Sequence, residues 1–493
     1  MMPGSRSRES GRIFVPKRVR LMSNEKLSNP VSSMLRHLIL LCIVLFLASS
    51  LLAAPPNVIL IYADDLGYAD LGCTGARGYA TPNLDRLARE GVRCTDFYVS
   101  SPVCSASRAA LMTGCYHERV GIRGALGPKS NQGLGLEHRI IPELLEASGY
   151  ASAIAGKWHL GSQPQWMPLA RGFDSYLGIP YSGDMWPHHP EVPKGYPPLP
   201  LFDGGVPIIA DVTPEDQKTF TLRYAARAVE FIKAHQQQPF FFYFAPNQPH
   251  VPLFVSDANA GKAESGLYGD VVQEIDQAVG QILQTLDDTG LASKTIVMFS
   301  SDNGPWLSYG NHAGSAGPLR EGKGTCFEGG IRVPFLARWP GKFPAGHVCH
   351  EPIMTIDILP TLLRYAGAKF PDAALDGRDL APLLENQPEA KSPHDALFFY
   401  YNSGELQAMR SGPWKLLFPH TARRMIGSDP GRDGTPGKYK PLEVGLELYD
   451  LRKDVGETKN LLSEKPEIVT TLQARADVMR KDLGDRLTIK PPN

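Results

Sequence analysis

The stretch CSASR, residues 104–108, combines a cysteine and an arginine at a spacing that could bind an anion. If a helix begins at Cys104, Arg108 lies one turn further along the same face. The first turn of a helix also offers free N–H groups and the positive end of the helix dipole. The pattern therefore predicts an anion site built around residue 104. A buried structural cysteine beside a surface arginine is the simpler alternative.

Polar residues also follow three apolar runs that are typical of buried strands. NVILIYADD ends in Asp64 and Asp65, PFFFYFAPNQPH ends in His250, and TIVMFSSDN ends in Asp302 and Asn303. Ligands gather at the carboxyl ends of strands in α/β sheets, so we expect these side chains to meet. Converging carboxylates would raise one another's pKa unless a cation neutralised them. The oxygen-rich set predicts Ca²⁺, with Mg²⁺ as second choice, whereas isolated Asx turns are the alternative.

The elements that would position these residues alternate along the chain. Strands are expected at 57–62, 151–156, 239–246 and 295–302, and helices at 81–92, 140–150, 220–236 and 270–290. This alternation predicts an α/β fold with a large mixed, mostly parallel sheet flanked by helices. Residues 180–214, dense in Pro, Gly, His and aromatic residues, are expected to form a long irregular loop near the mouth of the site.

Composition predicts three parts of the chain. Residues 1–54 are expected to be a disordered extension and a signal peptide, because the apolar run LILLCIVLFL is too short for a membrane span of about 20 residues. A retained anchor and a start at Met34 are alternatives. Residues 55–375 are the expected catalytic domain. Residues 376–493 are an expected smaller C-terminal α+β domain, an antiparallel sheet with a closing helix.

Charge and cysteine content limit the partners and the compartment. Lys+Arg and Asp+Glu each total 51, so no net field favours nucleic acid or, once the signal is removed, a membrane. A secreted or periplasmic location follows from the signal, and the absence of an Asn-x-Ser/Thr sequon favours a bacterial origin. Pairing is optional for the six cysteines beyond the signal, which are Cys73, Cys94, Cys104, Cys115, Cys326 and Cys349.

The sequence around Cys104 resembles the signature Cys-x-Pro/Ala-Ser-Arg of the type I, formylglycine-dependent sulfatases. The resemblance extends in order through ADDLGYADLGC, TPNLDRLAREG, AGKWHLG, GIPYSGD, SSDNGP, REGKGTCFEGGIRVP and ELYDLRKDVGETKNLL, and covers nearly all of the chain from Asn57 to Leu462. It is strongest toward the arylsulfatase A and N-acetylgalactosamine-6-sulfatase branch of the alkaline-phosphatase-like superfamily. Ala106 replaces the commoner proline, and Cys115 stands where arginine is usual.

The resemblance implies a sulfuric ester hydrolase of arylsulfatase type with that superfamily's fold. It implies that a separate maturation enzyme oxidises Cys104 to Cα-formylglycine (3-oxoalanine). The implied Ca²⁺ ligands are Asp64, Asp65, Asp302, Asn303 and the modified Cys104. The implied catalytic residues are Cys104, Arg108, His159, His250 and Lys323, and the implied substrate-binding residues are Lys157, Ser182, His250 and Lys323.

The family mechanism uses both hydroxyls of a hydrated aldehyde. One hydroxyl attacks sulfur while His250 or Lys323 protonates the leaving oxygen. Deprotonation of the second hydroxyl, with His159 as the expected base, re-forms the aldehyde and expels sulfate. The expected substrate is a sulfated small molecule or glycan, and sulfated carbohydrate is favoured because the enzyme is expected to be exported.

Two other functions remain open at the level of sequence. A phosphomonoesterase or phosphonate hydrolase of the same superfamily would share the fold and the strand-end carboxylates. Such enzymes usually hold two zinc ions through extra His and Asp ligands, whereas this chain offers lysines around the anion. A non-catalytic binder of sulfated glycans is the second alternative, and it applies if Cys104 stays unmodified.

Overall fold

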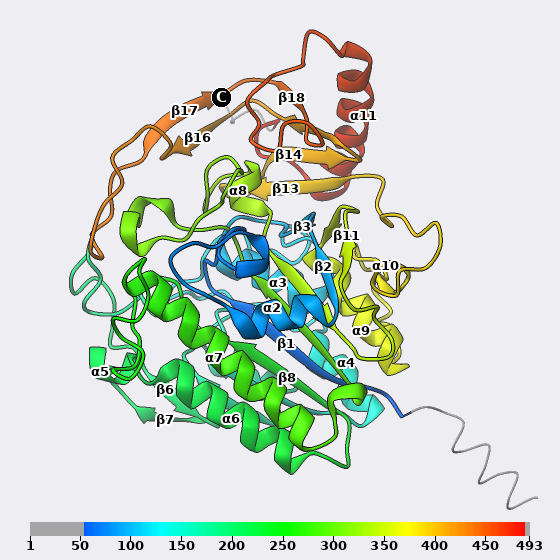
Figure 1. The fold of residues 1–493 in the computed structure, drawn as a ribbon. Coiled ribbons are helices and arrows are strands. Elements are labelled where there is room, and N and C mark those ends of the chain that lie inside the picture. The colour runs from blue at the N-terminus through cyan, green and yellow to red at the C-terminus, as the bar shows by residue number, and fades with distance from the viewer. Residues whose placement is uncertain (1–53, 489–493) are drawn as a thin grey trace, which may run out of the picture. The chain divides into compact units, whose positions relative to one another are not determined.

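A ten-stranded sheet forms the centre of the structure, a computed structural model that describes residues 54–488 (Figure 1). From edge to edge its strands are β11 (His347–Cys349), β2 (Val92–Cys94), β10 (Phe335–Arg338), β9 (Thr295–Ser301), β1 (Asn57–Ala63), β8 (Phe240–Ala245), β4 (Ala151–Gly156), β5 (Ser175–Gly178), β6 (Leu201–Asp203) and β7 (Val206–Ile209). The five central strands from β9 to β5 run parallel, and β10, β6 and β7 join antiparallel. The predicted mixed sheet is confirmed.

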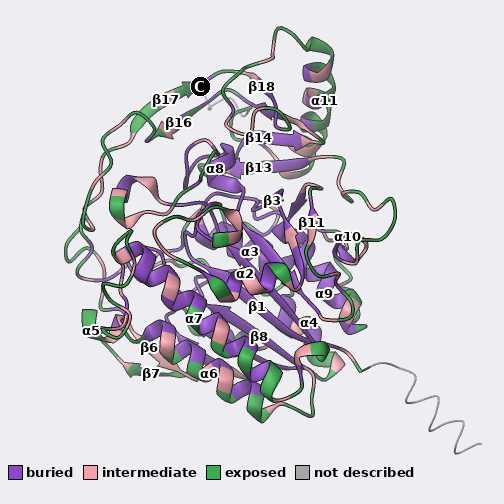
Figure 2. Ribbon diagram, viewed as in Figure 1, coloured by how far each residue is buried: buried purple, intermediate pink, exposed green. Residues whose placement is uncertain are grey.

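Alternate residues of the central strand β1 belong to two separate cores. Val58, Leu60 and Tyr62 pack in one core with α3 (Cys104–Thr113), α4 (Ile141–Leu145) and α9 (Ile358–Ala366). Ile59, Ile61 and Ala63 pack in the other with α2 (Pro82–Arg89), α6 (Phe220–Ala234) and α7 (Leu267–Asp288). Figure 2 shows the sheet buried between these layers. Burial on both faces explains why the strands are continuous apolar runs.

The prediction that residues 180–214 form one irregular loop is partly wrong. Residues 201–209, within the segment predicted to be irregular, form the hairpin β6–β7 at the sheet edge. Asp203 pairs with Val206, so Gly204 and Gly205 make a two-residue turn. Glycine suits this turn because Gly204 has a positive φ of 63°. The surrounding proline and aromatic residues obscured this short hairpin signal.

The C-terminal region contains its own antiparallel sheet, as predicted. Four strands pair in the order β13 (Leu397–Tyr401), β14 (Glu405–Ser411), β15 (Trp414–Leu417) and β18 (Glu447–Asp450). A separate two-stranded ribbon, which the sequence did not predict, joins β16 (His420–Arg424) to β17 (Lys440–Val444). The closing helix is α11 (Pro466–Leu483). The domain boundaries themselves remain predictions.

The expected extension and signal peptide lie outside the described residues, apart from Ala54. Among residues 54–488, no helix has the length and apolar character needed to cross a membrane. Each of the six cysteines in this range is a free thiol.

A fully buried ion cluster connects the C-terminal sheet to the large sheet's loops. Lys415 on β15 places Nζ 3.0 Å from Glu328 and 2.8 Å from Glu457, and none of these three side chains is exposed. Glu328 begins the short helix α8 (Glu328–Ile331). Burial alone would raise the pKa of Glu328, but Lys415 and neighbouring arginines lower it to about 2. The carboxylate is therefore ionised and depends on its cationic partners.

Replacing Lys415 with methionine is expected to lower the free energy of unfolding by about 3–5 kcal/mol, because it leaves buried carboxylates without their cation. Urea unfolding of the purified protein measures this change. Lys218→Met is the matched control, since Lys218 pairs with Glu215 at the surface and its loss is expected to leave the midpoint unchanged. Equal midpoints for both variants would contradict the prediction.

Candidate active site

The predicted acidic residues meet at the carboxyl ends of the central strands. Asp64 and Asp65 follow β1, and Asp302 and Asn303 follow β9, which is its parallel neighbour. The backbone N–H of Asp65 donates to Asp302 at 3.1 Å, and the Asn303 amide donates to Asp65 at 2.7 Å. All four residues are buried. The expected convergence is therefore observed.

Cys104 is the first residue of α3, as predicted. Its free thiol belongs to a residue only 3% exposed. Burial raises the pKa of this thiol, although the nearby charges of Lys157 and Lys323 act in the opposite direction. The thiol is consequently protonated at neutral pH, and an unmodified Cys104 is a poor nucleophile.

Three cationic side chains surround the acidic residues, and each has a different carboxylate as its nearest partner, although Arg108 Nη2 also lies 3.6 Å from Asp64 Oδ1. Lys157 Nζ lies 2.6 Å from Asp64 Oδ2, Lys323 Nζ lies 2.8 Å from Asp65 Oδ2, and Arg108 Nη2 lies 2.8 Å from Asp302 Oδ2. The two lysines come from distant parts of the chain. Their positive charges lie where an anionic ligand could be bound beside residue 104.

Hydrogen bonds from Arg108 to two neighbouring side chains fix the position of its guanidinium group. Its Nε donates to Asp302 at 2.9 Å, and its Nη1 donates to the hydroxyl of Tyr243 on β8 at 3.2 Å. The guanidinium is almost completely buried. Tyr243 fixes the orientation of this arginine, and this role is not predictable from the sequence because one hydroxyl in an apolar strand carries little signal.

Two oxygen atoms in this cluster lack donors. Asp64 Oδ1 and Asn303 Oδ1 are buried and have no hydrogen-bond partner within residues 54–488. Unsatisfied buried acceptors are costly and are suited to a cation. Burial and the charge of Asp64 also raise the pKa of Asp302, as expected for crowded carboxylates. The residues present therefore fit a hard divalent ion such as Ca²⁺.

A nitrogen ligand to the same ion is less suitable. Atoms of Asp64, Asp65 and His250 lie within 4.8 Å of one another. However, the Nδ1 of His250 faces the carbonyl of Val251, so Nδ1 carries the hydrogen. The Nε2 of His250 therefore accepts from Lys323 Nζ, 2.9 Å away. This leaves the oxygen atoms as the better ligands.

His159 has a different environment. Its Nε2 lies 2.9 Å from the carbonyl oxygen of Leu126 and therefore donates to it, and its buried Nδ1 has no partner in the described chain. Burial lowers the pKa of His159 well below its usual value, and the charges of Lys157 and Arg108 lower it further. The ring is neutral, and Nδ1 offers a free lone pair that could accept a proton.

Backbone strain is also concentrated here. Asp65 has a φ of 63° and His159 a φ of 62°, which lie in the left-handed region that non-glycine residues rarely adopt. Such conformations cost about 1–3 kcal/mol each and persist where the surrounding structure enforces them. Their position supports a functional role for this cluster.

The remaining predicted residue, Ser182, also belongs to the cluster. Its hydroxyl lies 3.2 Å from Lys157 Nζ. The structure thus brings all eleven predicted site residues into one region. Direct contacts link nine of them, and Cys104 and His159 are close enough for Lys157 to shift their pKa values.

The C-terminal region supports the loop that carries Lys323. Arg423 on β16 donates from Nε to the Lys323 carbonyl at 3.0 Å, and Glu457 accepts from the Glu328 N–H at 2.7 Å. On the other side, the Gly324 N–H donates to the carbonyl of Pro102, two residues before Cys104, at 2.9 Å. Arg423 was not predicted, since it lies 100 residues beyond Lys323.

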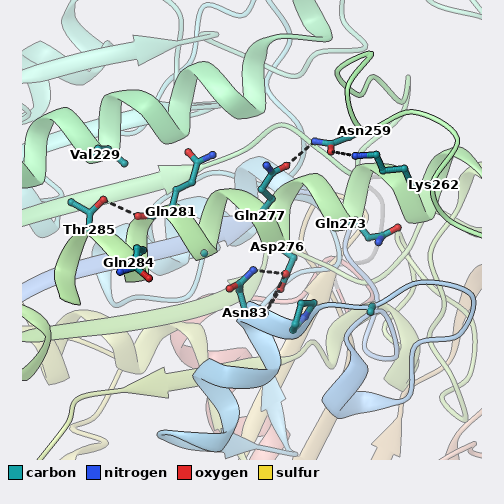
Figure 3. A pocket seen from close by; sticks show the side chains of 13 residues that line it. Asn83, Val229, Asn259, Lys262, Gln273, Asp276, Gln277, Gln281, Gln284 and Thr285 are labelled. Atoms are coloured by element: carbon teal, nitrogen blue, oxygen red, sulfur yellow. Dashed lines mark hydrogen bonds between the residues drawn. The ribbon is translucent and has the colours of Figure 1, made fainter. Parts of the chain in front are cut away.

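A surface hollow along α7 lies apart from these residues (Figure 3). Amide side chains such as Gln277 and Gln281 line it. Its carboxylate, Asp276, accepts from the backbone N–H of Asn83 at 3.0 Å and of Leu84 at 2.8 Å, at the start of α2. None of the predicted site residues lines this hollow, and its carboxylate is already paired.

Comparisons with known proteins agree with the geometry. The Sulfatase family model matches residues 56–368, and the model for the C-terminal region of aryl-sulfatase matches residues 392–488. Arylsulfatase A of Bos taurus is 41% identical over 472 residues, which cover 91% of this chain and 92% of that protein. N-acetylgalactosamine-6-sulfatase of Sus scrofa is 40% identical over 382 residues, with 74% and 72% covered.

A solved structure is similar over most of its length. The crystal structure of Ps i-CgsB in complex with k-i-k-neocarrahexaose is 29% identical, with a TM-score of 0.71. The similarity covers 86% of this chain and 92% of that chain.

Proposed function

The chain belongs to the sulfatase family and is a sulfuric ester hydrolase, and from this premise we propose that it hydrolyses sulfated carbohydrates with a formylglycine at position 104 and a bound Ca²⁺. One observation carries the proposal. Cys104 opens a buried helix beside Lys157, Lys323 and Arg108, yet its own thiol is protonated. An oxidised side chain there would supply the nucleophile that the thiol does not.

The carbohydrate substrate is supported by the similar proteins. One relative is named for N-acetylgalactosamine 6-sulfate, and the similar solved structure is a complex with a neocarrahexaose. The cluster of cations is suited to a sulfate group, and the substrate's alcohol would be recognised outside it. Export to the periplasm or the exterior is part of the same proposal and depends on the apolar run at 38–47.

The metal would be held by oxygen atoms of Asp64, Asp65, Asp302 and Asn303. The support is that one oxygen each of Asp64 and Asn303 is buried and accepts no hydrogen bond within the described residues. When bound, Ca²⁺ would supply positive charge beside residue 104 and the sulfuryl oxygens. The ion would also relieve the repulsion among the three carboxylates.

The cationic side chains have separate roles in this proposal. Lys157 and Lys323 neutralise negative charge that develops on the sulfuryl oxygens in the transition state. Arg108, fixed by Asp302 and Tyr243, holds the oxygens of the hydrated formylglycine. Ser182 hydrogen-bonds Lys157 and keeps its ammonium group directed at the substrate.

His250 and His159 serve as proton donor and proton acceptor in this proposal. Lys323 Nζ and His250 Nε2 lie 2.9 Å apart and share a proton, which can be delivered to the leaving oxygen. His159 Nδ1 offers the unprotonated lone pair that removes a proton from residue 104 when sulfate is released. These roles match the tautomers fixed by Val251 and Leu126.

Maturation must precede complete folding in this proposal. Cys104 is 3% exposed and Arg108 1% exposed, and Ala106 between them is fully buried. A maturation enzyme that reads this segment needs it as an accessible, extended chain. Conversion would therefore occur before α3 packs against the sheet.

Mass spectrometry and a matched pair of esters test the proposal together. The peptide containing residue 104 is expected to carry an aldehyde, and the enzyme is expected to hydrolyse 4-nitrophenyl sulfate much faster than 4-nitrophenyl phosphate. Faster hydrolysis of the phosphate would favour a phosphomonoesterase. An unmodified thiol, binding of sulfated glycans and no hydrolysis would favour a non-catalytic binder.

Removing the metal with EGTA is expected to lower kcat on the order of 10²-fold, because a few kcal/mol of charge stabilisation is lost. Adding back Ca²⁺ should restore activity more fully than adding Mg²⁺. Elemental analysis before and after chelation is the control. Full activity of a demonstrably metal-free enzyme would refute the proposed ion.

A further inference from the structure

Trp306 lies beside the groups assigned to the leaving oxygen. It follows the Asp302–Pro305 segment and is only partly buried. Its ring centroid is 4.2 Å from Lys323 Nζ and 5.3 Å from the ring of His250. Tyr309 packs edge-on against it at 5.0 Å and fixes its orientation. An alcohol that leaves toward His250 therefore passes a rigid, partly open aromatic surface.

Asp184 places an unpaired carboxylate oxygen in the same region. The residue lies two positions after Ser182 and is 8% exposed. Its Oδ1 is buried without a hydrogen-bond partner in the part of the chain that the structure describes. Its Oδ2 is 3.7 Å from His189 Nε2. A buried unpaired carboxylate oxygen is costly, and a hydroxyl group of a ligand would satisfy it.

Asp184 and Trp306 both lie near Lys323 and His250, since Trp306 contacts these two side chains and their charges act on Asp184. Burial alone would raise the pKa of Asp184, but His250, Lys323 and Lys157 lower it, so the group is ionised close to the proposed sulfate site. Burial raises the pKa of Tyr309, and the next largest cause is the charge of Asp184, which is therefore near the Trp306 segment as well. Both residues are therefore close to Lys323.

We propose that Trp306 and Asp184 form the subsite for the leaving alcohol. Trp306 packs against the apolar face of a sugar ring, and Asp184 accepts a hydrogen bond from one of its hydroxyls. The exposed Glu191 adds a second negative charge, since it also raises the pKa of Tyr309. A carboxylate on the leaving sugar is repelled, so the subsite selects uncharged sugar sulfates over uronate sulfates. This inference rests on the proposed function.

The charge selection is tested by Asp184→Asn, which preserves shape and removes charge. Matched substrates are the 2- and 3-sulfates of methyl galactoside and of methyl galactosiduronate, which differ only in having a hydroxymethyl group or a free carboxylate at C6. The ratio of kcat/KM for galactoside over galactosiduronate is expected to exceed tenfold in the unmodified enzyme and to fall about tenfold in the variant. Asp257→Asn, at a side chain 86% exposed, is the control and should leave the ratio unchanged. An unaltered ratio in Asp184→Asn overturns the charge selection.

The aromatic surface is tested by Trp306→Ala and Trp306→Phe. Trp306→Ala is expected to lower kcat/KM for the galactoside sulfates about 10- to 100-fold, chiefly through KM, and to affect 2-hydroxyethyl sulfate much less because that ester has no ring. Trp306→Phe should recover most of the loss. Equal losses on both esters would show that Trp306 acts only by positioning Lys323, and would overturn its place in the subsite.

Different results would refute the proposed function and the proposed subsite. A protein that hydrolyses no sulfate ester, including 4-nitrophenyl sulfate, refutes the proposed function. The subsite alone is refuted if the protein hydrolyses 4-nitrophenyl sulfate, Asp184→Asn keeps the original ratio of galactoside to uronate hydrolysis, and Trp306→Ala loses equally on the ring and ringless esters.

Discussion

Replacing Cys104 with serine is expected to abolish repeated turnover and to lower steady-state kcat on the order of 10⁴-fold or more. The serine hydroxyl would lie at the same helix start, beside Lys157 and Lys323, so it could still attack sulfur. A sulfated serine has no second hydroxyl with which to expel sulfate. The variant should therefore accumulate one covalent sulfuryl group per chain, which intact-mass spectrometry detects after incubation with substrate.

Cys115→Ser is the matched control for this experiment. Cys115 is also a buried free cysteine, and it lies just beyond the other end of α3. Its thiol is near the carbonyl of Ala374 rather than the cationic cluster. The control is expected to keep activity and to remain unlabelled. Sustained multiple turnover by Cys104→Ser would contradict the requirement for two hydroxyls at position 104.

Replacing Lys323 with alanine is expected to lower kcat/KM for sulfate esters about 10²- to 10³-fold, comparable with the loss of one oxyanion donor. The change removes the ammonium group that lies 2.8 Å from Asp65 and 2.9 Å from His250. The developing charge on the sulfuryl oxygens loses one cation, and His250 loses its proton partner. Initial rates with 4-nitrophenyl sulfate measure the effect.

Two comparisons make the Lys323 result specific. Lys323→Met keeps much of the side-chain length without its charge, so a similar loss in both variants would assign the effect to charge. Lys262→Ala removes an exposed lysine from the hollow along α7 and should leave kcat/KM unchanged. If Lys323→Ala retained the original kcat/KM, Lys323 would have no place at the reacting centre.

Much of the site could be predicted because its residues follow strands with strong apolar patterns. Asp64 follows the apolar run NVILIYA, and Asp302 follows TIVMF and two serines; both runs have the length and β-branched or aromatic content typical of strands buried on both faces. Neighbouring parallel strands then bring their carboxyl ends together. Cys104 could be placed at a helix start because an apolar helical segment follows it directly. These inferences use local pattern and one general rule of sheet topology.

Other features depend on contacts that no local pattern records. The ribbon β16–β17 is short and mostly polar, and its few apolar residues, such as Ala422, Leu442 and Val444, make too weak a pattern to predict strands. Arg423 on that ribbon reaches Lys323 only because the C-terminal sheet packs beside the loop. Trp306 directly follows the motif SSDNGP, and this position in the sequence is a signal that could have identified it. Tyr243 matters because its hydroxyl meets Arg108, which depends on side-chain packing.

The attachment of the Lys323 loop to the C-terminal region affects how such enzymes could be recombined. Arg423 and Glu457 hold the backbone of this loop, and Lys415 pairs with its far end. Exchanging the last hundred residues with those of a relative would therefore replace side chains that hold the Lys323 ammonium group in position. A working chimera would need to take both the Lys323 loop and the C-terminal residues that contact it from the same parent.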